Sequence, residues 1–153
     1  MPIKANFTAA DIRKRINAQI EDKKKAMIAK LFYIAEECLN NARANHKYMV
    51  QTGNLTSSIG YCILDNGEIV KAGEWKAIAG KLGDGNEGKQ KGMEYLKEVA
   101  AGQPQQGITF IMVAGMPYAQ YVEAMSLDVL DTSEQMAEEK IRELVAKVVK
   151  NGI

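Results

Sequence analysis

Few side chains in this sequence could form a catalytic or metal site. His46 is the only histidine, so a Ser-His-Asp or Cys-His arrangement would have to use it. It lies between Asn45 and Lys47, at the polar end of an expected helix. Cys38 and Cys62 stand 24 positions apart, a spacing unlike that of a zinc site, and His46 adds too few ligands to complete one. We therefore expect no catalytic residue, no metal and no cofactor, and two free thiols in a reducing compartment.

One segment partly matches the phosphate-binding loop of nucleotide-binding proteins. Residues 83–90 read Gly-Asp-Gly-Asn-Glu-Gly-Lys-Gln, which supplies a glycine, four residues and then Gly-Lys. Gln90 stands where a Ser or Thr hydroxyl would hold magnesium, and Asp84 and Glu87 would place carboxylates where phosphate should lie. We therefore expect no nucleotide site here.

Glu123 is the one carboxylate that follows two tyrosines and a predicted apolar strand. It follows Tyr118 and Tyr121 and lies just after an apolar strand, where burial would require a partner. A structural salt bridge is the first interpretation and a contact with another protein the second. The third is a small intracellular enzyme that uses Glu123 with Tyr118 or Tyr121 in a pocket.

A long N-terminal helix over residues 8–46 is the main element predicted around these groups. Thr8 and Asp11 resemble a capping box, with Asp in place of the usual Glu. The apolar residues that follow are spaced by three, four or seven positions and define one helical stripe: Ile12, Ile16, Ile20, Met27, Leu31, Ile34, Cys38 and Ala42. Unbroken, the helix would measure about 54 Å, against about 40 Å for a compact domain of this size. Either it breaks at the charged run 21–25, or one end projects and packs on something else.

Two short strands are predicted next. The runs 59–64 and 69–72 are apolar and are joined by Asn66-Gly67, which is the strongest short-range signal for a β-hairpin. Asp65 and Glu68 would flank this turn as like charges, an unfavourable pair unless a cation approaches them.

In residues 73–150 the sequence predicts an insertion, two strands and a helix. Residues 73–107 hold eight of the thirteen glycines and are expected to be a flexible insertion, with only 89–101 helical. Residues 108–114 predict a central strand and 127–130 a short strand, before a C-terminal helix over 132–150 capped by Asp131, Thr132 or Ser133. The whole, residues 1–153, is expected to be a single α+β domain. In it, an antiparallel sheet of three to four strands packs against the C-terminal helix.

Charge is distributed unevenly along the chain. The formal net charge is only +1, but residues 1–47 carry ten basic and five acidic side chains. The rest of the chain is mildly acidic, so copies could attract one another head to tail. A regulatory module whose basic first helix binds nucleic acid is another hypothesis, but no aromatic residues interleave with those basic ones to stack on bases. No apolar run is long enough to cross a membrane.

Two segments together resemble one protein family. Residues 52–59, Thr-Gly-Asn-Leu-Thr-Ser-Ser-Ile, are similar to the "TGxLxxSI" turn of head–tail joining and tail-completion proteins of long-tailed bacteriophages. Residues 117–123, Pro-Tyr-Ala-Gln-Tyr-Val-Glu, resemble the "YAxYVE" signature of the same family, the gene-product-ten-like tail components of lambda-like phages. The order of expected elements also agrees. After Glu123 the chain departs from the family pattern, because Ala124-Met125-Ser126 replaces an aromatic residue and Gly-Thr.

The resemblance implies a non-enzymatic structural protein of the virion, made in the cytoplasm of a bacterial host. Such a protein would sit at the head–tail junction or tail end, form a ring of identical subunits and contact other virion proteins. It would need no small-molecule substrate, membrane or specific nucleic acid. The interaction motif would then comprise the matching residues of the two segments: Thr52, Gly53, Leu55, Ser58, Tyr118, Tyr121 and Glu123.

Overall fold

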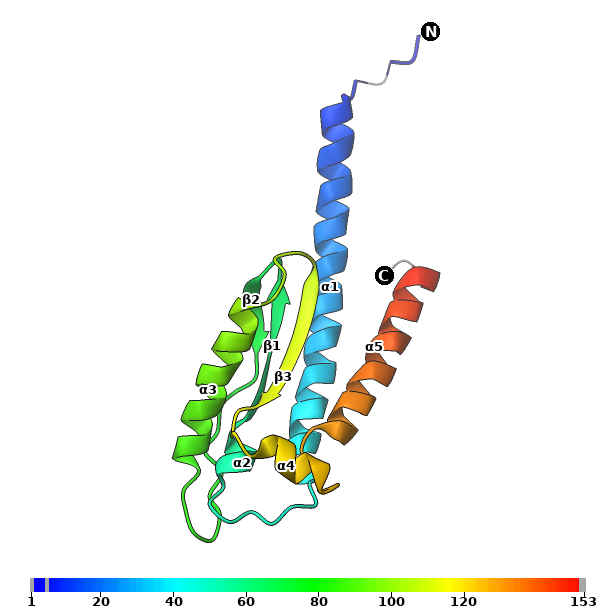
Figure 1. Ribbon diagram of the computed structural model, residues 1–153. Helices are drawn as coiled ribbons and strands as arrows, with labels where there is room; N and C mark the ends of the chain where they lie inside the picture. Colours follow the sequence, from blue (N-terminus) through cyan, green and yellow to red (C-terminus); the bar gives the residue numbers. More distant parts are fainter. Residues whose placement is uncertain (1, 5, 152–153) are drawn as a thin grey trace.

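The computed structural model describes residues 2–4 and 6–151 and has an α+β architecture, as predicted. Strands β1 (Ile59–Asp65), β2 (Glu68–Ala72) and β3 (Ile108–Ala114) form one antiparallel sheet in the order β2-β1-β3. Helix α1 (Ala9–Ala44) covers one face and α3 (Asn86–Ala101) the other, and α5 (Asp131–Asn151) lies against α1 (Figure 1). Two short helices, α2 (Asn54–Ser57) and α4 (Ala119–Ala124), lie together at one end.

Helix α1 is unbroken and begins at the predicted capping box. The Thr8 hydroxyl accepts a hydrogen bond from the amide of Asp11 at 3.2 Å, and the Asp11 carboxylate accepts one from the amide of Thr8 at 2.9 Å. These two bonds satisfy amides that would otherwise be unpaired at the start of a helix. Of the two alternatives drawn from the sequence, the projecting helix is therefore the correct one.

The N-terminal part of α1 extends beyond the sheet (Figure 1). All of residues 9–23 are exposed, and we call this segment the projecting half. The ammonium of Lys24 then lies 2.6 Å from the carboxylate of Asp65 at the β1–β2 turn, and burial begins at Ile28. Lys24 thus supplies the cation that the like-charged pair Asp65 and Glu68 requires, and it marks where α1 meets the body.

The centre of the sheet is β1, which is buried over nearly its whole length. The predicted hairpin is confirmed: β1 pairs with β2 through Asn66 and Gly67, which adopt φ values of 50° and 87°. The prediction of a central strand at 108–114 is wrong, because β3 pairs only with β1 and forms an edge. Ile111 and Val113 are buried beneath α3, whereas Phe110 and Met112 on the opposite face are only partly buried. The apolar composition of the strand therefore indicated burial without indicating its position in the sheet.

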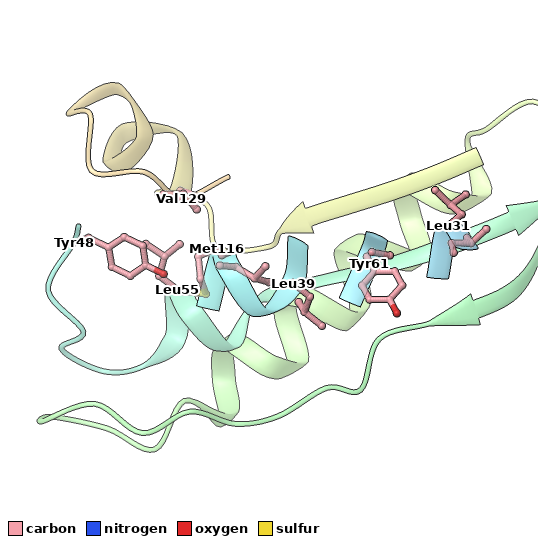
Figure 2. Packing of buried hydrophobic residues seen from close by; sticks show 12 residues of the cluster. Leu31, Leu39, Tyr48, Leu55, Tyr61, Met116 and Val129 are labelled. Carbon is pink, nitrogen blue, oxygen red and sulfur yellow. The ribbon is translucent and has the colours of Figure 1, made fainter. Parts of the chain in front are cut away.

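The two faces of the sheet form two apolar clusters. On the α1 side, Leu31 and Leu39 pack with Tyr61 and Ile63 (Figure 2). The buried Tyr61 hydroxyl donates to the Glu36 carboxylate at 2.5 Å. On the other side, Leu96 and Ala100 of α3 pack with residues of β1 and β3: Cys62, Leu64, Ile111 and Val113. The segment 73–107, expected to be a flexible insertion, therefore contains the helix that covers this second face.

Helix α5 packs mainly on α1 and runs antiparallel to it (Figure 1). The Ser133 hydroxyl donates to the Cys38 carbonyl oxygen at 3.1 Å and accepts from the Asn41 side-chain amide at 3.0 Å. Further along, Lys140 and Glu37 form an ion pair at 2.6 Å. The short strand expected at 127–130 is absent from the described residues, because the backbone there turns irregularly into α5.

Candidate functional site

The two sequence segments that resemble the phage family meet around one open hollow. It has a volume of about 520 Å³ and lies where the chain leaves α1 and passes the end of α4. Thr52, Gly53 and Leu55 of the first segment and Tyr118 of the second all line it. These residues are more than 60 positions apart, and the fold brings them together. The buried Tyr48, whose hydroxyl lies 2.9 Å from that of Thr56, also lines it.

Gly53 fixes the shape of the first segment. Its φ of +80° lies in the left-handed region, which side chains other than glycine rarely adopt. A Cβ atom added here would lie 1.8 Å from the carbonyl oxygen of Ile78, so the backbone of the segment 73–107 passes directly against it. The Thr52 hydroxyl accepts a hydrogen bond from the Asn54 amide at 3.2 Å, and α2 begins there.

Two of the predicted interaction residues are structural. Leu55 is 7% exposed and belongs to the core cluster on the α1 side, with only its edge at the hollow. Ser58 is fully buried, and its hydroxyl donates to the Leu55 carbonyl oxygen at 2.7 Å. Ser58 therefore holds the last turn of α2 and offers nothing to a partner.

Side chains next to the predicted ones anchor the glycine-rich segment to this turn. The Ser57 hydroxyl accepts from the Ile78 amide at 2.7 Å and donates to the Ile78 carbonyl oxygen at 3.1 Å. The Asn54 side-chain oxygen accepts from the Gly88 amide at 3.1 Å, and the Leu82 amide donates to the Gln51 carbonyl oxygen at 2.8 Å. The sequence analysis did not single out Ser57 or Asn54 for this role, because hydrogen bonds to a distant loop leave no local signal.

The second segment contributes exposed aromatic groups. Tyr118, which precedes α4, is 39% exposed at the rim of the hollow. Tyr121 is 75% exposed and points outside the hollow's lining. Met49 and Met125 are also largely exposed. This end of the molecule therefore presents apolar and phenolic side chains to solvent around a concave surface.

Glu123 caps helix α5. Its carboxylate accepts hydrogen bonds from the backbone amides of Val129 and Leu130, both at 2.7 Å, and of Asp131 at 2.9 Å. A carboxylate at a helix N-terminus satisfies unpaired amides and interacts favourably with the helix dipole. The expected salt bridge is thus replaced by backbone hydrogen bonds.

The predicted caps of α5, Asp131, Thr132 or Ser133, are wrong, because the chain folds back and places Glu123 eight residues upstream at this position. Asp128, with a φ of 55°, completes the cap by accepting from the Thr132 amide at 3.0 Å.

His46, Cys38 and Cys62 each have a separate environment. His46 stacks on Tyr48 with ring centroids 4.1 Å apart, and its Nδ1 lies 3.0 Å from the Tyr48 carbonyl oxygen. Cys38 and Cys62 are both buried and free, and burial raises the pKa of each thiol. Within residues 2–4 and 6–151, no three His, Cys, Asp or Glu side chains cluster closely enough to hold a metal ion.

The segment that partly matches a phosphate-binding loop serves as the start of α3. Gly85 occupies the N-cap position with a φ of 78°, and the Asp84 carboxylate accepts from the Asn86 amide at 3.0 Å, which lowers the pKa of Asp84. Glu87 pairs with Lys91 at 3.0 Å one turn further on. Carboxylates therefore occupy the first turn of this helix, where a phosphate-binding loop would offer its amides to an anion.

Comparisons with known proteins add no family assignment. No protein-family model, no curated protein and no solved structure matches the chain. In the part of the chain that the structure describes, none of the helices has the length and apolar character needed to cross a lipid bilayer.

Proposed function

We propose that this protein is a non-enzymatic structural component of a bacteriophage or prophage particle, acting at the head–tail junction or the tail end. It would be made in the cytoplasm of the host bacterium and then incorporated into the virion. There it would assemble into a ring of identical subunits and dock to neighbouring virion proteins. In such a ring, different faces of each subunit must complement one another, since each contact is head to tail.

One observation carries the proposal: the two segments that resemble the phage family line the same exposed hollow. Gly53 and Thr52 shape one side and Tyr118 the other. The exposed side chains of Tyr118 and Met49 line it, and tyrosine and methionine are enriched at protein–protein interfaces. A concave, partly apolar surface of this kind is suited to receiving a protruding segment of another protein.

The alternative of an enzyme based on Glu123 is disfavoured by the bonding of that carboxylate. Its two oxygens already accept three backbone hydrogen bonds at the start of α5, so the carboxylate is engaged inside the molecule and is not directed at a substrate. Tyr121 lies outside the hollow that Tyr118 lines, so the two phenols do not share a pocket with Glu123.

Genomic context and particle composition test the proposal directly. We expect the gene to lie among genes for portal, capsid and tail-tube proteins, and the protein to be present in purified particles by mass spectrometry. Electron microscopy of such particles should place copies at the tail end or the neck. Particles that lack the protein but are complete and infectious would contradict the proposal.

A variant pair tests the docking surface. We expect Tyr118→Ala, which alters the rim of the hollow, to reduce incorporation into particles at least about tenfold, as loss of an interface tyrosine can cost about 1–2 kcal/mol or more. Tyr33→Ala is the matched control, because Tyr33 is 76% exposed on α1, away from the hollow. Complementation of a phage lacking the gene measures both. Equal activity of the two variants would remove Tyr118 from the docking surface.

A further inference from the structure

The projecting half of α1 carries an uncovered apolar stripe. Ile12, Ile16 and Ile20 are 46%, 50% and 54% exposed, although isoleucine is among the residues most often buried. Their spacing of four places them on one side of the helix. The stripe continues, beyond the end of the sheet, the series of apolar residues that α1 buries further along, at Leu31 and Ala35. A helix face of this kind stabilises the fold only when another surface covers it.

An apolar groove of matching form lies between β3 and α5, and we call it the α5 groove. It has a volume of about 680 Å³ and is open to solvent. Phe110 and Met112 of β3 form one wall, and Ala137 and Ile141 contribute the apolar part of the other. The small side chain of Ala137, at the middle of the wall, permits close approach of a second helix.

The spacing along the groove matches the spacing of the stripe. Its α5 wall is built from residue pairs that recur every four positions: Ser133 and Glu134, Ala137 and Glu138, Ile141 and Arg142. Ile12, Ile16 and Ile20 also recur every four positions. Since four residues of α-helix rise about 6 Å, three layers of one helix can meet three layers of the other when the two lie nearly parallel.

The charges that border the two surfaces are complementary in one direction only. Arg13 and Arg15 flank the start of the stripe, one on each side, whereas Lys23 lies on the stripe face just beyond Ile20. Along the groove the charge changes from acidic to basic, from Glu134 and Glu138 to Arg142. A docked helix that runs in the same direction as α5 therefore places Arg13 and Arg15 beside Glu134 and Glu138, whereas the reverse direction places them beside Arg142.

We propose that the projecting half of α1 binds in the α5 groove of a second copy of this chain. Within one chain α1 runs antiparallel to α5, so a docked helix parallel to α5 runs opposite to the α1 of the copy that receives it. Two copies related in this way exchange their helix ends reciprocally around a two-fold axis. Neighbours in a large ring differ by a small rotation and cannot make this contact. The pair is therefore a form of the free protein, and it does not rest on the function proposed above.

The mass of the full chain in solution tests the pairing. We expect sedimentation equilibrium at high micromolar concentration to give the mass of two chains. Ile16→Glu should give the mass of one chain. Its unfolding midpoint should equal that of the unaltered protein at low concentration, where pairs dissociate, because residues 9–23 are all exposed in the single chain. Ile69→Glu is the matched control and should remain paired, because Ile69 is also exposed, at 52%, but lies on β2.

Charge reversal tests the direction of the docked helix. The double variant Arg13→Glu with Arg15→Glu should weaken the pair at least about tenfold, equivalent to 1.4 kcal/mol. Adding Glu134→Arg with Glu138→Arg to the same chain should restore it. A restored pair supports the parallel direction, and continued weakness overturns it.

A disulfide between the two surfaces distinguishes a closed pair from a growing chain. With Ile16→Cys and Ala137→Cys in one chain, oxidation should link two copies and no more, because both bonds form within the same pair. Three results would overturn the proposal: a one-chain mass for the unaltered protein, a pair unaffected by Ile16→Glu, or a ladder of linked chains longer than two. None of them bears on whether the protein belongs to a phage particle.

Discussion

Gly53 joins two requirements at one position: a left-handed backbone and contact with the carbonyl of Ile78. We predict that Gly53→Ala destabilises the protein by about 2–4 kcal/mol, since the strained φ costs 1–2 kcal/mol and the overlap adds a further packing cost. Urea unfolding followed by circular dichroism measures the change. Gly107→Ala is the matched control, because Gly107 has a similar φ of +76° but no atom within 4 Å of an added Cβ.

The comparison isolates the close approach from the backbone strain. Gly107→Ala should cost only about 1–2 kcal/mol. If both variants lowered the free energy of unfolding by the same amount, the contact between Gly53 and the segment 73–107 would not contribute to stability. In that case the hollow would not depend on that segment for its shape.

Glu123 is predicted to stabilise α5 through its charge. Glu123→Gln keeps the size of the side chain but replaces a carboxylate oxygen by an amide group that cannot accept from the backbone. We expect a loss of about 1–3 kcal/mol in the free energy of unfolding, because the hydrogen bonds that remain lose their charge and one amide loses its partner. Glu139→Gln, at an exposed position of the same helix, should change it by less than about 0.5 kcal/mol. An equal effect of both substitutions would rule out the cap.

At the scale of elements, α1 is one helix with two environments. Ala18 and Ala29 are both exposed, but Ala18 lies in the projecting half and Ala29 lies where α1 covers the sheet. In the Ile16→Glu background, which keeps copies apart, we predict that Ala29→Gly lowers the free energy of unfolding by about 1 kcal/mol. Ala18→Gly should leave it almost unchanged and reduce helical circular dichroism instead, since that half opens independently of the core. Equal losses would mean that α1 unfolds as one unit with the body.

Local sequence signals predicted the elements that local interactions determine. The capping box at Thr8 and the hairpin at Asn66 and Gly67 were both correct, because each is formed by residues close in the chain. The position of β3 in the sheet was wrong, because an apolar strand is buried by whichever helices cover it, and the sequence does not specify its neighbours. The start of α5 was predicted to within one residue, but its capping residue was wrong for the same reason: the cap comes from Glu123, beyond the helix itself.

The candidate site was only partly predictable. Resemblance selected Thr52, Gly53 and Tyr118, which do line one hollow, but it also selected Ser58 and Glu123, whose side chains hold backbone groups inside the molecule. Residue type alone cannot distinguish a polar group that faces a partner from one that satisfies a buried amide. That distinction depends on contacts between segments distant in the chain.

At the scale of the whole molecule, the two proposed contact surfaces lie at opposite ends. The hollow lies beside α2 and α4, and the projecting half of α1 extends from the other end of the sheet (Figure 1). The buried core lies between them, and α1 spans most of the distance (Figure 1). Each surface can therefore be engaged or altered without direct contact with the other, which suits a protein proposed to connect neighbours.

The boundary at Lys24 has a further consequence for a chain that has not yet paired. A helical segment of about fifteen residues without a covering surface frays readily in water, and this one carries Arg13, Lys14 and Arg15. A trypsin-like protease would cut there first, before touching the body. The remaining chain would keep its core and melt almost normally, yet it would have lost the stripe. Folding and competence to associate could thus be uncoupled by a single proteolytic cut.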